Sequence, residues 1–511
     1  MSILRYTASL DNTITNAFEE DLSTRGTGSN MGASDILEVF SIYQQATSAS
    51  VELSRVLIQF PLTQITADRA SGVLPTSGVT WKLKLYNAKH SETVPKSYRL
   101  QVSAVSASWE EGTGLDMEAY SDLTEDDEGS NWTRRAGSTS WTTIGGDYHS
   151  TPAPIANTET DFDSGLEDLE VNVTTIVDRW IAGTTTNYGF GVRLTDSYEG
   201  YFSSSTGANT ATEIHNLSGA KKSYYTKKFF GRSTEFFFKR PVLEAQFNDT
   251  KKDHRGNFTL SSSALPAADN LNRLYCYNYV RGRLVDIAGD NSIQPVVKLY
   301  YSSGSVPEGS VRGFRRGSDN AAVTSLSATR ESEGVFYIEI ASTSSIVTTT
   351  YPYIVDVWET PGGEEFFTGS AITPVKFSPS NEKSRKNYVM SMTNLKEEYQ
   401  ADQTVRLRVY AREKNWSPNI YTTAKSQPEN FTIESGSYRL LRIVDDLEVI
   451  SYGTGSVKYS ELSYDVSGNY FDLDMSLLEP GYQYGFKFSI YDDYTQNYVE
   501  QPYLFKFRVI K

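Results

Sequence analysis

The pattern of apolar and polar positions is most informative between residues 166 and 194. Apolar residues first alternate, as in a half-buried strand, and then take the three- and four-residue spacing of a short amphipathic helix. The alternating residues are Leu169, Val171 and Val173, and the helical ones are Ile176, Val177, Trp180 and Ile181. Gly183 suits the end of this helix, and residues 188–192 have the composition of a second strand. The segment predicts a strand, helix and strand in which Trp180 fills a core and Gly183 and Gly189 shape the return strand.

Short apolar and aromatic runs recur along the whole chain, with turn residues between them. The clearest runs are 56–60, 81–86, 98–102, 334–340, 353–358, 405–410 and 486–491. The 34 Tyr and 24 Phe residues favour strands, and few segments have helical periodicity. We therefore expect an all-β protein built from sandwiches.

Changes in composition divide the chain into three predicted domains, at residues 1–245, 246–377 and 378–511. The first closes with an apolar strand at 235–244, which Pro241 interrupts, and the second ends at a Ser-, Pro- and Lys-containing linker at 378–384. The second and third domains have the size of immunoglobulin-like β-sandwiches. Residues 478–484 resemble the tyrosine corner of fibronectin type III domains, which implies that the Tyr484 hydroxyl binds a backbone group.

The first domain carries seven short motifs in a characteristic order. They lie at 11–14, 30–39, 54–62, 82–86, 109–112, 141–148 and 178–190. Their order and spacing resemble the DNRLRE-type β-sandwich, a jelly-roll-like module of surface proteins and carbohydrate-binding chains. The resemblance implies a jelly-roll-like β-sandwich over residues 1–245, in which tryptophans beside glycines fill a two-sheet core.

The first domain also departs from that family. Met31 stands where an aromatic residue is usual, Gln59 interrupts the strand that ends in Phe60, and long insertions occupy residues 120–139 and 200–225. The insertions weaken any transfer of a ligand site from the family. They favour a surface adapted for protein contacts.

Charge and cysteine content exclude several classes of function. The chain of 511 residues has a formal net charge of −15, which argues against nucleic acid as a partner. Two lysine pairs, 221–222 and 227–228, are too short to reverse this. The single cysteine, Cys276, excludes internal disulfides and suits a buried small apolar residue. The N-terminal residues lack the pattern of an export signal, and no apolar run suits a membrane span, so we expect no membrane partner.

Candidate chemical sites are few. Acidic residues in two loops could supply oxygen ligands to Ca²⁺, but neither follows EF-hand spacing, so we expect no cofactor. These residues are Asp126, Asp127 and Glu128, and Asp161 with Asp163. The four histidines, His90, His149, His215 and His254, lie in separate loop-like segments without a nucleophile motif. No carboxylate pair, zinc spacing or phosphate-binding loop is recognisable, so an enzyme is disfavoured.

Three tryptophans, Trp109, Trp132 and Trp141, are the candidate sugar-stacking residues. Core packing is the commoner role of a tryptophan in a sandwich. A glycan site would leave two or three indoles coplanar on one surface, whereas a scaffold would bury most of them. Exposure of the indoles therefore discriminates the two hypotheses.

A cysteine-poor chain of β-sandwiches is typical of bacteriophage virion proteins, which assemble in the host cytoplasm and leave by lysis. Residues 394–399 and 405–418 are similar to segments of structural proteins of tailed phages. We therefore predict a non-enzymatic virion protein of the capsid exterior, neck or tail, whose partners are other virion proteins and copies of itself. Arg406, Arg408 and Tyr410, opposite Val405, Leu407 and Val409, would offer polar contacts or form a solvated face.

Two alternatives belong to other classes. The first is a carbohydrate-binding host-adhesion protein, whose partner would be a host surface glycan. The second is a depolymerase, which would need a carboxylate pair in a groove.

Overall fold

The computed structural model is all-β, which confirms the predicted fold class. It describes residues 2–90, 94–118, 129–151, 158–376, 387–415, 417, 420, 430–453 and 457–511, so the predicted linker at 378–384 lies outside the described residues. Contacts divide the chain into two compact units, one formed by Ile3–Ala70 with Leu74–Phe247 and one that contains Asn248–Lys511. Within the described ranges, no helix has the length and apolar composition to cross a membrane. The division at 377/378 stays a prediction.

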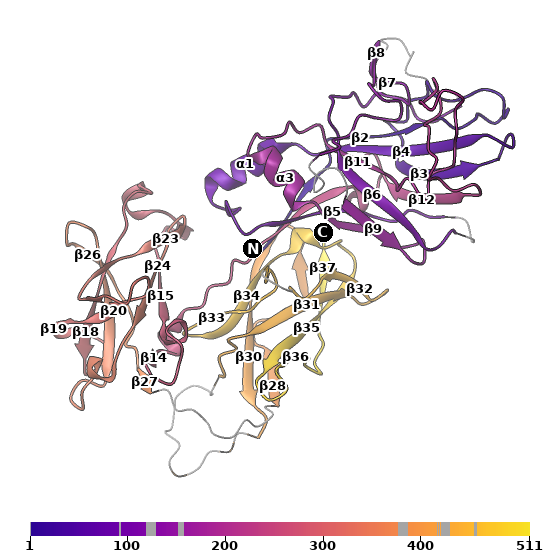
Figure 1. Ribbon diagram of the computed structural model, residues 1–511. Coiled ribbons are helices and arrows are strands. Elements are labelled where there is room, and N and C mark those ends of the chain that lie inside the picture. Colours follow the sequence, from indigo (N-terminus) through magenta and orange to yellow (C-terminus); the bar gives the residue numbers. More distant parts are fainter. Residues whose placement is uncertain are drawn as a thin grey trace. The chain divides into compact units, whose positions relative to one another are not determined.

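The N-terminal unit is built around two antiparallel sheets (Figure 1). The four-stranded sheet has the order β1 (Ile3–Thr7), β13 (Val242–Gln246), β5 (Thr80–Leu85) and β10 (Leu169–Asn172). The seven-stranded sheet has the order β12 (Tyr224–Phe230), β3 (Ile36–Tyr43), β4 (Val51–Gln59), β11 (Phe190–Leu194), β6 (Tyr98–Ala104) and β9 (Thr158–Phe162), and β2 (Leu10–Thr15) pairs with β4. A short hairpin joins β7 (Arg134–Ala136) and β8 (Thr139–Ser140).

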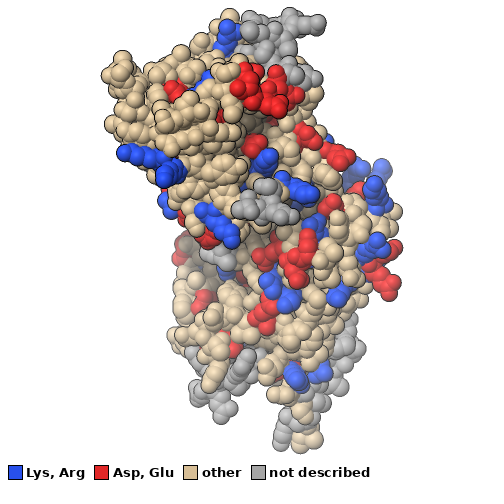
Figure 2. Space-filling model, turned by 90° about the vertical axis from the view of Figure 1, so that its right-hand side faces the viewer, with Lys and Arg blue, Asp and Glu red and all other residues tan. Residues whose placement is uncertain are grey.

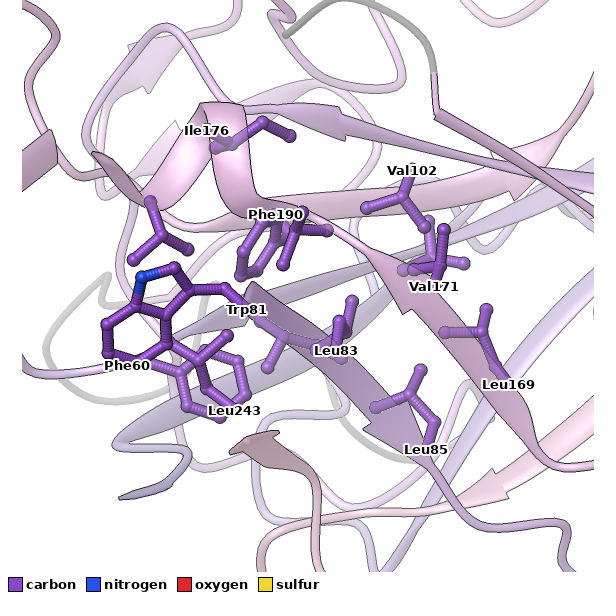
Figure 3. Packing of buried hydrophobic residues seen from close by; sticks show 14 of the residues in the cluster. Phe60, Trp81, Leu83, Leu85, Val102, Leu169, Val171, Ile176, Phe190 and Leu243 are labelled. Carbon is purple, nitrogen blue, oxygen red and sulfur yellow. The ribbon is translucent and has the colours of Figure 1, made fainter. Parts of the chain in front are cut away.

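One large apolar core lies between the two sheets. Because side chains alternate along a strand, β5 places Trp81, Leu83 and Leu85 in this core and its lysines on the outer face. Figure 3 shows these residues among side chains of β10 and β11, such as Val171 and Phe190. The alternation in the sequence thus fixes which face of each sheet is buried.

The predicted strand, helix and strand between residues 166 and 194 are confirmed as β10, α3 (Thr174–Ile181) and β11. Trp180 is buried, and its ring centroid lies 4.7 Å from that of Phe190. Gly183 has φ +68° after the helix. Gly189 has φ +87°, and a Cβ there would lie 2.2 Å from the Ile58 carbonyl oxygen, so both features require glycine.

Two elements differ from the sequence prediction. Residues before Pro241 form a 3₁₀ turn, η1 (Phe237–Lys239), so the closing strand β13 begins only at Val242. Pro241 has no N–H for a ladder, which explains the late start. Helix α1 (Leu62–Ser71) was not predicted, because only Ile65 of its residues is buried and no apolar stripe marks it. Helices α1 and α3 lie side by side (Figure 1), with Arg69 Nη2 3.8 Å from Asp178 Oδ1.

The C-terminal unit contains four larger sheets. Two sheets lie between residues 272 and 368. The first contains β15 (Asn272–Tyr277), β24 (Val335–Ala341), β20 (Phe314–Arg316), β21 (Ala322–Val323) and β23 (Thr329–Ser332). The second contains β19 (Glu308–Arg312), β18 (Val296–Ser302), β25 (Tyr353–Glu359), β26 (Glu365–Thr368) and β22 (Leu326–Ser327). Short pairs join β14 (Thr259–Leu260) to β27 (Val375–Lys376), and β16 (Tyr279–Val280) to β17 (Arg283–Leu284).

The other two sheets lie between residues 388 and 510. The first contains β28 (Tyr388–Met392), β30 (Thr404–Glu413), β34 (Gly468–Asp474) and β33 (Ser463–Asp465). The second contains β29 (Glu398–Gln400), β37 (Phe505–Ile510), β35 (Gln483–Asp492), β31 (Gly436–Arg442), β32 (Leu447–Ile450) and β36 (Asn497–Glu500). Buried Tyr484 donates its hydroxyl hydrogen to the Glu479 carbonyl at 2.9 Å. The predicted backbone contact of Tyr484 is confirmed.

Candidate functional site

The two insertions of the N-terminal unit cover the outer face of the seven-stranded sheet. Strand β4 sends Val56 and Ile58 into the main core, while Leu53 and Leu57 join a second apolar cluster on the opposite face. The indole of Trp132, in the first insertion, donates to the Thr212 carbonyl of the second insertion at 2.9 Å. The insertions therefore pack on each other and close this face of the sheet.

The structure corrects the sugar-stacking hypothesis for the three candidate tryptophans. Trp109, Trp132 and Trp141 are only 6%, 0% and 5% exposed and belong to the second apolar cluster. Each indole N–H donates to a backbone carbonyl, at 2.8 Å to Tyr188, 2.9 Å to Thr212 and 2.9 Å to Asn131. Buried rings cannot stack on a sugar, so these three residues form core and no glycan platform.

A polar pocket of about 540 Å³ lies in the same covering layer. We call it the insertion pocket, because residues 214–216 of the second insertion line it together with β4, β11 and residues 142–148. Its titratable residues are Arg55, Asp147, Tyr148, Arg193, Asp196, Glu199 and His215. The sequence pattern does not point to the arginines or to Glu199; the one signal is Arg55, a charged residue directly before the apolar run Val56–Ile58.

A buried ion pair forms part of this lining. Arg55 Nε and Nη2 lie 3.1 and 2.9 Å from the two carboxylate oxygens of Glu199, and Arg55 Nη1 donates to the Gly145 carbonyl at 3.0 Å. The two side chains are 6% and 4% exposed. Burial lowers the pKa of Arg55, but the Glu199 charge more than offsets this and leaves the pKa raised. Arg55 therefore keeps its charge beside the Glu199 carboxylate.

Arg193 is the pocket residue with a donor left unused. Its Nη1 lies 2.6 Å from Asp196 Oδ1 and 3.9 Å from Glu199 Oε2. Its Nε is buried and has no hydrogen-bond partner in the described part of the chain. Burial raises the pKa of Asp196, but the charge of Arg193 outweighs it and the pKa is lowered. The pocket thus offers a cationic donor beside an ionised carboxylate.

Glycines make room for the tyrosine of the pocket. A Cβ on Gly191 of β11 would lie 2.0 Å from Tyr148 Cε1, and one on Gly146, at φ +102°, would lie 2.5 Å from the Tyr148 hydroxyl oxygen. The hydroxyl donates to the Gly145 carbonyl at 3.0 Å. The Gly-Gly-Asp-Tyr motif therefore fixes one wall of the insertion pocket.

The remaining candidate residues do not converge. Asp126, Asp127 and Glu128 lie outside the described residues, and Asp161 accepts from Arg99 Nε at 2.6 Å. Over the described ranges, no three His, Cys, Asp or Glu side chains are grouped to hold a metal ion. The predicted burial of Cys276 is confirmed, and burial raises its thiol pKa to about 12.

The polar face of β30 is confirmed but is already paired. Arg406 makes two contacts of 2.9 Å with Asp472, and Arg408 makes two of 3.0 Å with Asp465. Basic and acidic side chains are also interspersed on the face that Figure 2 shows. The two arginines are thus used within the chain.

Exposed aromatic side chains gather at two places. The tyrosine hairpin, formed by Tyr491, Tyr494 and Tyr498 around the β35–β36 turn, is 37%, 60% and 44% exposed at these residues. The phenylalanine pair, Phe236 and Phe237, is 49% and 56% exposed. Cations lie over this pair, with Lys239 Nζ 5.6 Å from the Phe236 centroid and Arg240 Cζ 5.5 Å from that of Phe237.

Comparison with known proteins adds no family. No protein-family model matches the chain. The curated proteins give no match either. Similar solved structures include the FN1–FN3 domains of chicken CNTN1, with 9% identity over 60% of this chain and 86% of that chain and a TM-score of 0.15. Trypsin-activated alpha-2-macroglobulin from Escherichia coli has 8% identity over 84% and 22%, with a TM-score of 0.15.

A DUF4785 family protein from Legionella pneumophila is also similar, with 9% identity over 99% of this chain and 89% of that chain and a TM-score of 0.13. At such TM-scores none of these structures supports an inference about the present chain.

Proposed function

We propose that this chain is a non-enzymatic structural protein of a bacteriophage virion and that it binds its neighbours through exposed aromatic residues. The observation that carries the proposal is the contrast between buried and exposed rings. All six tryptophans in the described residues are buried, whereas the tyrosine hairpin and the phenylalanine pair face solvent. Exposed Tyr and Phe beside Arg are the composition of the centre of protein interfaces.

The partners in this proposal are other virion proteins and copies of the same chain, in the capsid exterior, neck or tail. The DNRLRE-like character of residues 1–245 and the immunoglobulin-like character of the two later domains belong to the same proposal. A single buried cysteine with a raised pKa suits assembly in a reducing host cytoplasm.

Mass spectrometry of purified particles tests the location, and substitutions test the contact. The triple variant Y491S/Y494S/Y498S should fold and yet be incorporated into particles at least tenfold less than the unchanged chain, on the order of the loss of one interface hot spot. Tyr224→Ser is the matched control, since Tyr224 is 66% exposed and lies outside the hairpin. Absence of the chain from purified particles, or undiminished incorporation of the triple variant, contradicts the proposal.

A carbohydrate-binding host-adhesion protein is the second candidate, and the insertion pocket is the observation that favours it. The Arg193 guanidinium and the Thr142 and Thr143 hydroxyls suit the hydroxyl or carboxylate groups of a sugar. Glycan-array binding by the full chain tests this, with Arg193→Met as the pocket variant and Arg406→Met as the control. The adhesion function predicts a signal that only Arg193→Met abolishes, and a flat array for the unchanged chain contradicts it.

A further inference from the structure

Lys227 is a fully buried lysine in the N-terminal sandwich. Strand β12 places it on the inner face, and its side chain is 0% exposed. Its Nζ lies 5.2 Å from the ring centroids of both Phe162 and Phe229. An ammonium group in such apolar surroundings is costly, so its polar partners decide its state.

The hydrogen-bond partners of this amine are uncharged. Lys227 Nζ donates to Asn87 Oδ1 at 2.6 Å and to the Gly165 carbonyl at 3.1 Å. Burial lowers the pKa of Lys227 to about 8, although the charges of Asp168 and Glu167 oppose this. At pH 7 about a tenth of the side chain is therefore a neutral amine, and a neutral amine is a nucleophile.

The contact also places the amine next to an electrophilic carbon. Since a C=O bond is about 1.23 Å long, Nζ lies no more than about 3.8 Å from Asn87 Cγ. This is close to the separation of reacting atoms in a near-attack arrangement. We propose that Lys227 and Asn87 form an intramolecular isopeptide bond.

The reaction balances without an oxidant or a co-reactant. The Nζ lone pair attacks Asn87 Cγ, the Nζ–Cγ bond forms, the Cγ–Nδ2 bond breaks, and ammonia leaves. One proton passes from Nζ to the departing nitrogen, and the product is an uncharged secondary amide. Loss of the ammonium charge also removes the cost of burying it.

We assign the transfer of that proton to Glu167, a carboxylate whose charge acts on Lys227. Its Oε2 is buried and has no hydrogen-bond partner among the residues that the structure describes. Burial raises its pKa, but hydrogen bonds from the Ser164 region outweigh this and lower the pKa to about 2. Glu167 is thus an ionised carboxylate beside the reacting pair.

The bond would tie the two sheets together where the larger sheet curls on itself. Asn87 follows β5 of the four-stranded sheet, and Lys227 lies on β12, an end strand of the seven-stranded sheet, 140 residues away in sequence. The other end strand, β9, carries Phe162, whose ring centroid is 6.4 Å from that of Phe229 on β12. A covalent link here would hold the two end strands of the larger sheet, β12 and β9, close together. This role does not depend on which partner the chain binds.

Intact-mass spectrometry of the full chain tests the proposal. The expected mass is lower than that of the sequence by one molecule of ammonia. A tryptic digest should contain one branched peptide that joins the segments around Asn87 and Lys227. An unshifted mass, with the two segments recovered as separate peptides, overturns the proposal.

Variants give a second readout, and circular dichroism shows which of them fold. Lys227→Met and Asn87→Ala should each show no ammonia loss. Lys228→Met should keep it, because Lys228 is 38% exposed and pairs with Glu38 at 3.6 Å. Glu167→Gln should fold, as judged by circular dichroism, with most chains unlinked. Ammonia loss that persists in Lys227→Met contradicts the assignment.

Discussion

The two outer faces of the N-terminal sandwich are completed in different ways. On the four-stranded sheet, ion pairs run across the strands: Arg5 Nε lies 2.8 Å from Glu244, and Lys84 Nζ lies 2.9 Å from Glu244 and 3.3 Å from Glu170. On the seven-stranded sheet, three buried indoles cover the face, one of them (Trp132) from an insertion, and the Arg55–Glu199 pair is buried beside them.

The sequence of each strand explains this difference. In β5 the apolar residues alternate with Lys82 and Lys84, so one face is polar from the start. In β4, Leu53 and Leu57 are as apolar as Val56 and Ile58, so both faces need cover. The covered face therefore depends on packing, and the other face depends on ion pairs between its strands.

The largest expected effect is at the centre of the covering layer. Trp132→Ala should lower the free energy of unfolding by about 4 kcal/mol, because a fully buried indole leaves a cavity. Urea unfolding followed by tryptophan fluorescence and circular dichroism measures this. Trp132→Phe should cost less than half as much. A loss below about 1 kcal/mol for Trp132→Ala would show that the insertions do not act as a second core.

Breaking the buried ion pair should have the second largest effect on the free energy of unfolding. Arg55→Met leaves the Glu199 carboxylate buried without its closest partner and should cost about 3 kcal/mol. The double variant R55M/E199Q should recover part of this stability, because the uncompensated charge is gone. Urea titration compares the single variant Arg55→Met with the double variant R55M/E199Q. Equal free energies of unfolding for these two variants contradict the pairing of Arg55 with Glu199.

The N-terminal sandwich should also lose stability as pH rises, through a buried carboxyl on β2 that lies opposite Ile58 of the main core. Burial, with a smaller effect from Glu111, raises the pKa of Asp11 on β2 to about 7. Because the folded-state pKa lies above the unfolded value of about 3.9, the stabilising contribution is complete below that value. It is lost as pH rises toward 7.

The expected loss between pH 5 and pH 8 is on the order of 2 kcal/mol. Thermal unfolding of the chain and of Asp11→Asn across this interval measures it. The variant should lack this component of the pH dependence. Identical pH profiles would show that Asp11 is not the titrating group.

The ion-paired face should give the smallest effect. Lys82 pairs with Glu170, and the two side chains are 26% and 44% exposed. Lys82→Met should change the free energy of unfolding by less than about 1 kcal/mol, since exposed pairs contribute little. A loss as large as that of Trp132→Ala would remove the proposed distinction between the two faces.

Local patterns allowed much of the fold to be predicted, while the roles of single residues depended on distant contacts. Alternation located β5, β30 and β35, and helical spacing located α3 with Trp180. Whether Trp132 is exposed depends on Thr212, in another insertion, and no local pattern encodes that contact.

The insertion pocket and the proposed isopeptide bond escaped prediction for the same reason. Arg55 and Glu199 are 144 residues apart, and in the sequence Lys227 stands out only as half of a short lysine pair. Alternation along β12, with Phe229 two residues later, is the signal that could have placed Lys227 inside.

Hydroxyl-radical footprinting of the free chain and of purified particles tests the central claim most directly, because it reports the exposure of each aromatic side chain. The proposed function predicts that Tyr491, Tyr494 and Tyr498, with Phe236 and Phe237, are labelled in the free chain and protected in the particle. Labelling of these five residues to the same extent in both states would contradict the claim that they bind neighbouring proteins.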